Sequence, residues 1–183
     1  GEAEITLREV LASGFPQPGV VSSTPGLAYL ESGRLVRTSA SEVLRNPDEL
    51  PPPCWDLVNM QEYRERWMRS SGFFSLNLST TRGCPFHCNW CAKPIYGNRY
   101  NVHSPERTIG HLRVLLQLYG ASHIWMTDDI FGLKPGWVRQ FADLVEKENL
   151  RFRFKIQSRA DLLLQEKTIA ENKAPAQTNH TIQ

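Results

Sequence analysis

From Phe73 onward, the apolar residues of this chain follow two periods in turn. Residues 73–81 are apolar at every second position, which predicts a strand with one buried face. A run of apolar residues at helical spacing follows, and Ser104–Pro105 supplies both an N-cap and a first-turn proline for that helix. The same order repeats twice, with strands at 122–132 and 152–163 and helices from 138 and from 162. Three consecutive strand–helix units predict an α/β fold with a parallel sheet covered by helices.

The first 72 residues lack this regular alternation. Residues 1–14 carry apolar side chains at helical spacing and predict a short amphipathic helix that ends at Gly14. Residues 15–53 hold most of the prolines and are interpreted as a linker, interrupted by a hairpin around the turn residues 31–34. Residues 61–69 predict another short helix before the first strand.

The charge of the chain points to no macromolecular partner. Twenty-one basic and nineteen acidic residues leave a net charge of +2, with the two signs interspersed. This balance gives no argument for a nucleic-acid or membrane-surface partner. The sequence also has neither an apolar run long enough for a membrane span nor a signal segment, so we expect a cytoplasmic protein. In a reducing compartment, clustered cysteines indicate metal binding or catalysis rather than disulfides.

Three of the four cysteines, Cys84, Cys88 and Cys91, lie within eight residues directly after the first predicted strand. Thiolates are soft ligands, and this spacing lets one loop place three sulfurs around a single inorganic centre. A 4Fe-4S cluster held by three cysteines keeps one iron open for a substrate or cofactor. Gly83 and Pro85 flank the first cysteine, as expected of a loop that turns tightly around a cluster.

Two other interpretations remain open at this point. Zinc takes four nitrogen or sulfur ligands, so His87 or Cys54 would complete a structural zinc site in a binding module. A ferredoxin-like electron carrier is a third interpretation, which a single three-cysteine motif disfavours. The context favours the open cluster, because ligand sites of α/β folds are built from loops at the carboxyl ends of strands. We expect Cys54 to be a small buried apolar residue near Trp55, and His87 to be an exposed loop residue.

The Cys-x-x-x-Cys-x-x-Cys motif after a first strand, with Trp90 before the last cysteine, resembles the radical S-adenosylmethionine superfamily. The wider chain resembles its cobalamin-binding branch. The matching stretches are GEAEITL at the start, LAYLESGRLVRT and LPPPCWDL in the linker, STTRGCPFHCNWCAKPIYGNRYNVHSPE at the cysteines, and WMTDDIFG and IQSRADLL on the second and third strands.

The resemblance implies a partial (βα) radical S-adenosylmethionine barrel of about three βα units, preceded by a remnant of a cobalamin-binding domain and a linker. The implied segments are residues 1–14 for the remnant, 15–70 for the linker with its small hairpin, 71–170 for the amino-terminal half of the radical domain, and 171–183 for an aberrant or truncated tail. The chain is interpreted as a fragment. It contains no Asp-x-His-x-x-Gly run, the usual cobalt-ligand motif of this branch, so cobalamin is expected only in a longer parent protein.

The resemblance also implies the chemistry. A 4Fe-4S cluster on Cys84, Cys88 and Cys91 would bind S-adenosylmethionine, and an electron from a donor such as flavodoxin or ferredoxin would cleave it to methionine and a 5'-deoxyadenosyl radical. That radical would act on a small-molecule or peptide substrate. The cofactor-binding residues implied are Trp90, Lys93, Thr127, Asp128, Asp129, Ser158 and Arg159. Asp128 is expected to accept a hydrogen bond from the methionine ammonium, in a motif that departs from the usual two glycines and an acid.

Overall fold

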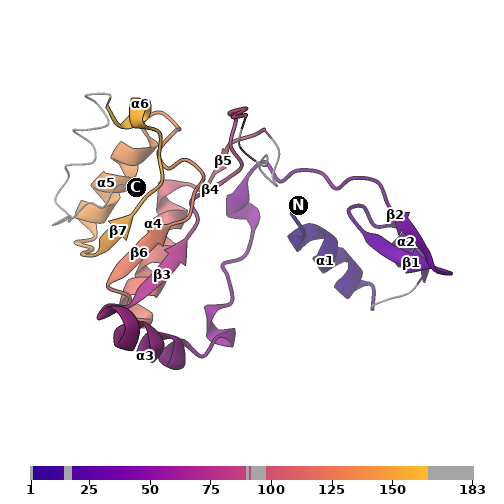
Figure 1. The fold of residues 1–183 in the computed structure, drawn as a ribbon, viewed down its shortest axis with the longest axis horizontal. Helices are drawn as coiled ribbons and strands as arrows, with labels where there is room; N and C mark the ends of the chain where they lie inside the picture. Colours follow the sequence, from indigo (N-terminus) through magenta and orange to yellow (C-terminus); the bar gives the residue numbers. More distant parts are fainter. Residues whose placement is uncertain (1, 15–17, 90, 92–97, 165–183) are drawn as a thin grey trace.

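The computed structural model describes residues 2–14, 18–89, 91 and 98–164. Strands and helices alternate in its second half, as the sequence predicts (Figure 1). The strands of this half are β3 (Ser75–Leu78), β4 (Thr81–Arg82), β5 (Asn101–Val102), β6 (His123–Met126) and β7 (Arg153–Lys155). Its helices are α3 (Met60–Ser71), α4 (Pro105–Arg113), α5 (Trp137–Lys147) and α6 (Ala160–Leu163).

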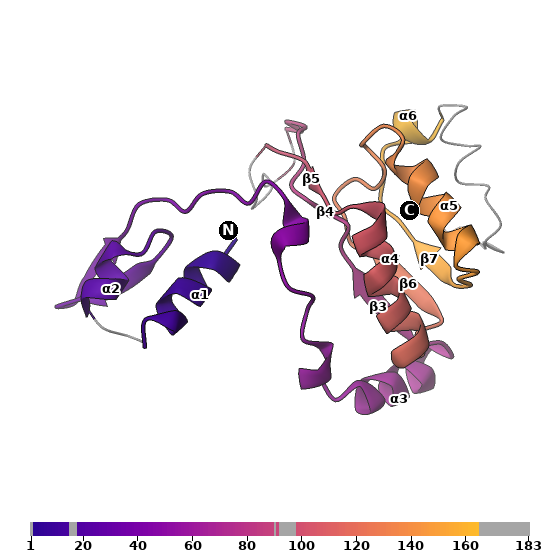
Figure 2. The same cartoon turned by 180° about the vertical axis from the view of Figure 1, so that it is seen from behind.

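The predicted parallel sheet is confirmed. Its strand order is β3–β6–β7, and each adjacent pair is parallel, with Leu76 beside Ile124 and Ile124 beside Phe154. Helices α4 and α5 lie side by side on one face of this sheet (Figure 2). The opposite face carries Asn77, Trp125 and Lys155 in one row of the register, and the Lys155 ammonium lies 4.8 Å from the centre of a Trp125 ring.

The hydrophobic core forms between the sheet and these two helices. The side chains that alternate with the polar row point into it and are almost fully buried, and so are those on the inner stripes of α4 and α5. The core residues include Phe74, Leu76, Leu78, Ile109, Leu112, Leu115, Ile124, Met126, Val138 and Phe141. The period-two and period-3.6 patterns therefore identified the buried faces correctly.

The capping residues explain where the helices begin and end. Ser104 lies before Pro105 and its hydroxyl accepts a hydrogen bond from the Arg107 backbone N–H at 3.1 Å, as predicted. The helix does not stay α-helical as far as Gly120, because residues Val114–Leu118 form a π-helical turn. Helix α3 ends at Ser71 and is capped by Gly72, whose φ of 73° is the left-handed conformation that glycine adopts without a Cβ penalty.

The amino-terminal segment is a separate, smaller arrangement beside the sheet (Figure 1). It contains α1 (Glu4–Ala12) and an antiparallel hairpin of β1 (Ala28–Glu31) and β2 (Arg34–Arg37), both as predicted. Ser32 and Gly33 have positive φ, which a two-residue hairpin turn requires. The linker also contains a short helix α2 (Pro18–Ser23), which its proline content concealed. The predicted burial of Cys54 is wrong: this thiol is exposed.

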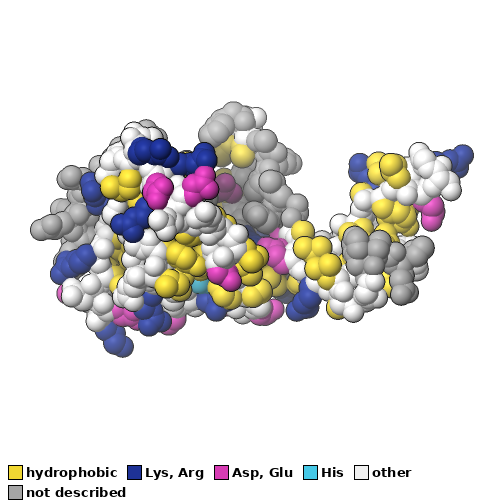
Figure 3. Space-filling view, turned by 90° about the horizontal axis from the view of Figure 1, so that it is seen from below, with side chains coloured by type: hydrophobic (Ala, Val, Ile, Leu, Met, Phe, Trp, Pro, Cys, Tyr) yellow, Lys and Arg dark blue, Asp and Glu magenta, His cyan; other side chains and the backbone are white. Residues whose placement is uncertain are grey.

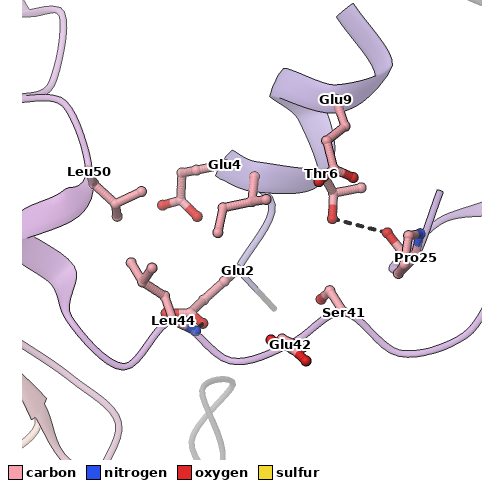
Figure 4. A pocket seen from close by; sticks show the side chains of 10 residues that line it. Glu2, Glu4, Thr6, Glu9, Pro25, Ser41, Glu42, Leu44 and Leu50 are labelled. Carbon is pink, nitrogen blue, oxygen red and sulfur yellow. Dashed lines mark hydrogen bonds between the residues drawn. The ribbon is translucent and has the colours of Figure 1, made fainter. Parts of the chain in front are cut away.

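Two glutamates of the amino-terminal segment connect it to the start of the cysteine loop. The Arg82 guanidinium, on β4, pairs with Glu2 at 3.3 Å and with Glu4 at 2.5 Å. The hydrogen bond from Arg82 lowers the pKa of Glu4. A cavity of about 230 Å³ lies beside these carboxylates. It is lined by α1 and by the chain near Ser41 and Leu44 (Figure 4). The Leu44 N–H donates to the Glu2 carboxylate at 2.6 Å, so the linker near Leu44 is also held beside these carboxylates.

The surface outside these contacts is mixed in charge. Figure 3 shows acidic and basic side chains interspersed with apolar ones over the face in view. Within the part of the chain that the structure describes, no helix combines the length and apolarity that crossing a bilayer requires.

The buried side chain of His111 is expected to make the free energy of unfolding depend on pH. His111 is 8% exposed and packs edge-on against Trp55, with His103, Arg107 and Asp48 as the charged or titratable groups around it. Burial, aided by the positive charge of Arg107 and by His103, lowers its pKa to about 4, although Asp48 opposes the shift.

Because this pKa is lower in the folded state than in the unfolded one, the unfolded state takes up the proton first. The contribution of His111 is therefore complete above pH ~6.5 and is lost as the pH falls toward 4, by at most about 3 kcal/mol. We expect the unfolding temperature of the native chain to fall more steeply over this range than that of His111→Phe, measured by circular dichroism. Parallel curves would contradict the assignment.

Candidate functional site

A short antiparallel ladder closes the base of the cysteine loop. Thr81 of β4 pairs with Val102 of β5, Arg82 pairs with Asn101, and the His103 N–H donates to the Thr80 carbonyl at 2.9 Å. The chain therefore leaves the parallel sheet after β3, forms the cysteine loop, and returns along β5. The loop emerges where β3 and β6 end, which is the edge of a parallel sheet where α/β folds place ligands.

The three cysteines of this loop are free thiols. Cys84 is half-buried, whereas Cys88 and Cys91 are exposed, and Gly83 before them is buried with a φ of 84°. The Cys91 N–H donates to the Cys88 carbonyl at 3.1 Å, so the last two cysteines lie on one turn.

These thiols do not have the geometry of a ligand set for one ion. Among the described residues, no three His, Cys, Asp or Glu side chains converge as the ligands of a single metal ion do. His87 is exposed, as predicted.

Arg159 lies against the cysteine loop. Its guanidinium carbon is 4.2 Å from the centre of the Phe86 ring, between the first two cysteines in sequence. Asp161 holds the guanidinium through two hydrogen bonds of 2.9 and 3.0 Å, and these raise the pKa of Arg159. The third strand was predicted to run to residue 163, but it ends at Lys155, and Arg159 is the N-cap of α6. The fold nevertheless brings this cation to the cysteine loop.

The loop after β6 carries the predicted residues Thr127, Asp128 and Asp129, and only the middle one is buried. The side chains of Thr127 and Asp129 are exposed, whereas Asp128 is 1% exposed. The Asp128 carboxylate accepts hydrogen bonds from the Ser79–Thr81 segment instead of facing solvent. Burial raises the pKa of Asp128, and the hydrogen bonds from Thr80 and Thr81 oppose this shift.

Tyr100 ties the far end of the cysteine loop to the same β6 loop. Its hydroxyl donates to the Ile130 carbonyl at 3.1 Å and accepts from the Leu133 N–H at 3.2 Å. Burial raises the pKa of Tyr100 to about 12, so the hydroxyl keeps its proton at neutral pH. The backbone of the β6 loop is held in turn by the segment after β7, since the Phe131 N–H donates to the Gln157 carbonyl at 2.8 Å.

One of the predicted cofactor-binding residues, Ser158, also forms a hydrogen bond with the loop after β6. Its hydroxyl donates to the Phe131 carbonyl at 3.0 Å. Trp90 and Lys93 lie outside the described residues, so their roles stay predictions. Thr80, Phe86 and Tyr100 were not predicted as site residues, because only their spatial neighbours reveal a role. Their position inside or beside the loop was the one available signal.

A three-stranded parallel sheet with a three-cysteine loop at its carboxyl edge defines the class of protein: an α/β protein with a candidate cluster site at the sheet edge, which resembles the radical S-adenosylmethionine superfamily. Comparison with known proteins confirms this resemblance, although no family model matches the chain. An uncharacterized methyltransferase of Pyrococcus horikoshii is 31% identical over 165 residues, which is 88% of this chain and 34% of the relative.

Two further relatives act on different molecules according to their names. The anaerobic magnesium-protoporphyrin IX monomethyl ester cyclase of Cereibacter sphaeroides is 26% identical over 57% of this chain and 16% of its own length. The hopanoid C-3 methylase of Methylococcus capsulatus is 26% identical over 64% of this chain and 22% of its own length. These relatives are enzymes, as the sequence predicted for this protein, and the chain spans about a third or less of each.

The fold is also found in a solved structure. TsrM from Kitasatospora setae, a radical S-adenosylmethionine methyltransferase, superposes with a TM-score of 0.59 at 17% identity, over 97% of this chain and 44% of TsrM. Solved structures of TsrM hold a [4Fe-4S] cluster and cobalamin, or tryptophan and an S-adenosylmethionine analogue. The cofactors expected from the sequence are those that this neighbour binds.

Proposed function

We propose that this chain is the cluster-binding part of an enzyme that reductively cleaves S-adenosylmethionine to methionine and a 5'-deoxyadenosyl radical. The observation that carries the proposal is the placement of the three-cysteine loop at the carboxyl edge of β3 and β6, closed at its base by the β4–β5 ladder. Cys84, Cys88 and Cys91 would hold a 4Fe-4S cluster, and the fourth iron would remain open for the cofactor. A low-potential one-electron donor would supply the electron.

Three exposed or partly exposed groups around the loop suit the polar parts of S-adenosylmethionine. Asp129 is an exposed carboxylate at the end of β6 and suits the ammonium of the methionine moiety. Arg159, on the Phe86 ring, suits a carboxylate or an acceptor on the ribose. The Thr127 hydroxyl is exposed on the same edge. Trp90 keeps its predicted place near the adenine.

The polar face of the sheet, opposite α4 and α5, would line the reaction chamber. In a complete barrel the face opposite α4 and α5 points inward, and here that face carries Asn77, Trp125 and Lys155. We propose that residues 71–170 form about three βα units of such a barrel, and that α1 is the end of a cobalamin-binding domain. Methyl transfer to a small-molecule or peptide substrate is the reaction class that the names of the relatives favour.

Anaerobic reconstitution with iron and sulfide tests the proposal directly. We expect the chain to take up about four iron and four sulfide per molecule and to show the broad visible absorption of a 4Fe-4S cluster. Addition of S-adenosylmethionine should change the electron paramagnetic resonance spectrum of the dithionite-reduced cluster. Stoichiometric zinc binding in place of iron and sulfide would favour a structural metal module instead. The matched control is Cys84→Ala/Cys88→Ala/Cys91→Ala, which should take up neither.

A further inference from the structure

The loop after β6 forms hydrogen bonds with both ends of the cysteine loop. At the amino-terminal end of the cysteine loop, the entry, these hydrogen bonds are made by Asp128. The exit is held by the Tyr100 hydroxyl, through Ile130 and Leu133. The entry is Ser79–Thr81, which comprises the two residues where the chain turns from β3 to β4 and the first residue of β4; we call it the Ser79–Thr81 turn. Three residues after this turn the chain reaches Cys84, so the orientation of the turn sets where the first sulfur lies.

The two carboxylate oxygens of Asp128 are both occupied. Oδ1 accepts from the Thr80 N–H at 2.6 Å and from the Thr81 N–H at 2.8 Å. The Ser79 hydroxyl lies 3.4 Å from Oδ1, but its one proton has a closer acceptor in the Thr81 carbonyl at 2.9 Å. Oδ2 accepts from the Thr80 hydroxyl at 2.6 Å. Asp128 and Thr80 are each 1% exposed, so water cannot replace these bonds. Two adjacent backbone N–H groups would be left buried and unpaired if the carboxylate were removed.

This arrangement differs from that of a ligand for the cofactor ammonium. A carboxylate that binds a soluble ligand must present an oxygen to the cavity, whereas Asp128 presents its oxygens to the backbone of the strand end. Asp129, the next residue, is exposed and free of this constraint. The two adjacent acids therefore have separate environments within one motif.

We propose that Asp128 is a positioning residue, which holds the Ser79–Thr81 turn against β6 and thereby sets the position of Cys84. This inference rests on the proposed function, because it assigns a role toward the cluster that the three cysteines would hold. It also explains why the motif carries two acids: one shapes the loop and the other remains available to the cofactor. Thr80 is the partner on which the geometry depends most, since it supplies two of the three short hydrogen bonds to the carboxylate.

The Asp128→Asn variant separates positioning from charge. An asparagine oxygen can still accept from the two backbone N–H groups, and its amide can donate to the Thr80 hydroxyl, which also accepts. A positioning role therefore predicts that Asp128→Asn keeps near-native iron and sulfide content. Its affinity for S-adenosylmethionine should stay within about threefold of the native value, which is less than half the free-energy change of a tenfold loss of affinity. Asp128→Ala should lose most of its cluster. Asp129→Asn should keep the cluster and weaken only cofactor binding.

The measurements are iron and sulfide per chain, the resonance spectrum of the reduced cluster, and calorimetric titration with S-adenosylmethionine. Thr80→Val is an independent test of the positioning role, because it removes one hydroxyl donor while Asp128 keeps its charge. We expect this variant to lose part of its cluster and to show a broadened resonance spectrum. If Asp128→Ala fails to fold, Thr80→Val and Asp128→Asn still decide the question.

Two results would overturn the inference. One is an Asp128→Asn protein with full cluster content and at least tenfold weaker cofactor binding, which would assign the role to charge. The other is native cluster content in both Asp128→Ala and Thr80→Val. Failure of the native chain to take up more iron and sulfide than the triple cysteine variant would instead reject the proposed function, so the two failures are distinct.

Discussion

Replacing any one of Cys84, Cys88 or Cys91 with alanine is expected to abolish the iron–sulfur cluster. A cubane with three protein thiolates keeps one iron open for the cofactor, and removal of a second thiolate leaves two irons without protein ligands. The measurement is iron and sulfide per chain after anaerobic reconstitution, with the visible absorption of the cluster expected to be absent from the variants.

The matched control is Cys54→Ala. Cys54 is exposed and lies in the linker, before η2 (Trp55–Leu57), so its loss should leave the cluster intact. Equal loss of iron in this variant would show that the linker cysteine belongs to the ligand set. Circular dichroism of each variant separates loss of a ligand from loss of the fold.

The second large effect is expected in the core beneath the site. Met126 is fully buried, pairs with Leu78 across the parallel ladder, and precedes Asp128 by two residues. Met126→Ala would leave a cavity at the carboxyl ends of both strands and is expected to lower the free energy of unfolding by about 2–5 kcal/mol. Urea unfolding of the apoprotein, followed by tryptophan fluorescence, measures this change.

Met126→Leu provides the comparison, because it conserves volume and is expected to cost less than about 1.5 kcal/mol. Leu118→Ala, at a side chain that is 72% exposed, should change the free energy of unfolding by no more than about 0.5 kcal/mol. Equal urea midpoints for Met126→Ala and Leu118→Ala would show that the ends of β3 and β6 do not form a packed core.

The relation between the two neighbouring acids could not be inferred from the sequence. Asp128 and Asp129 are chemically identical, and the motif alone favoured Asp128 as the ligand of the ammonium. The packing of β6 against β3 buries one of them against the Thr80 and Thr81 backbone and leaves the other in solvent. That distinction depends on groups 47 and 48 residues away in sequence.

The local pattern of the chain determined much of the rest. Alternation at residues 73–81, the Ser104–Pro105 cap and the apolar helical stripes specify elements through short-range geometry, and these elements formed as predicted. The spacing of Cys84, Cys88 and Cys91 identified the site, because ligand spacing within one loop is itself a local property.

Only the tertiary structure decided which residues surround that loop. The stacking of Arg159 on Phe86, the anchoring by Tyr100 and the pairing of Arg82 with Glu2 join segments that are distant in sequence. Such contacts depend on strand order and on the edge where parallel strands end, which periodicity does not encode residue by residue. Local periodicity fixed the elements and the ligand motif, and long-range packing fixed the surroundings that would give the motif its chemistry.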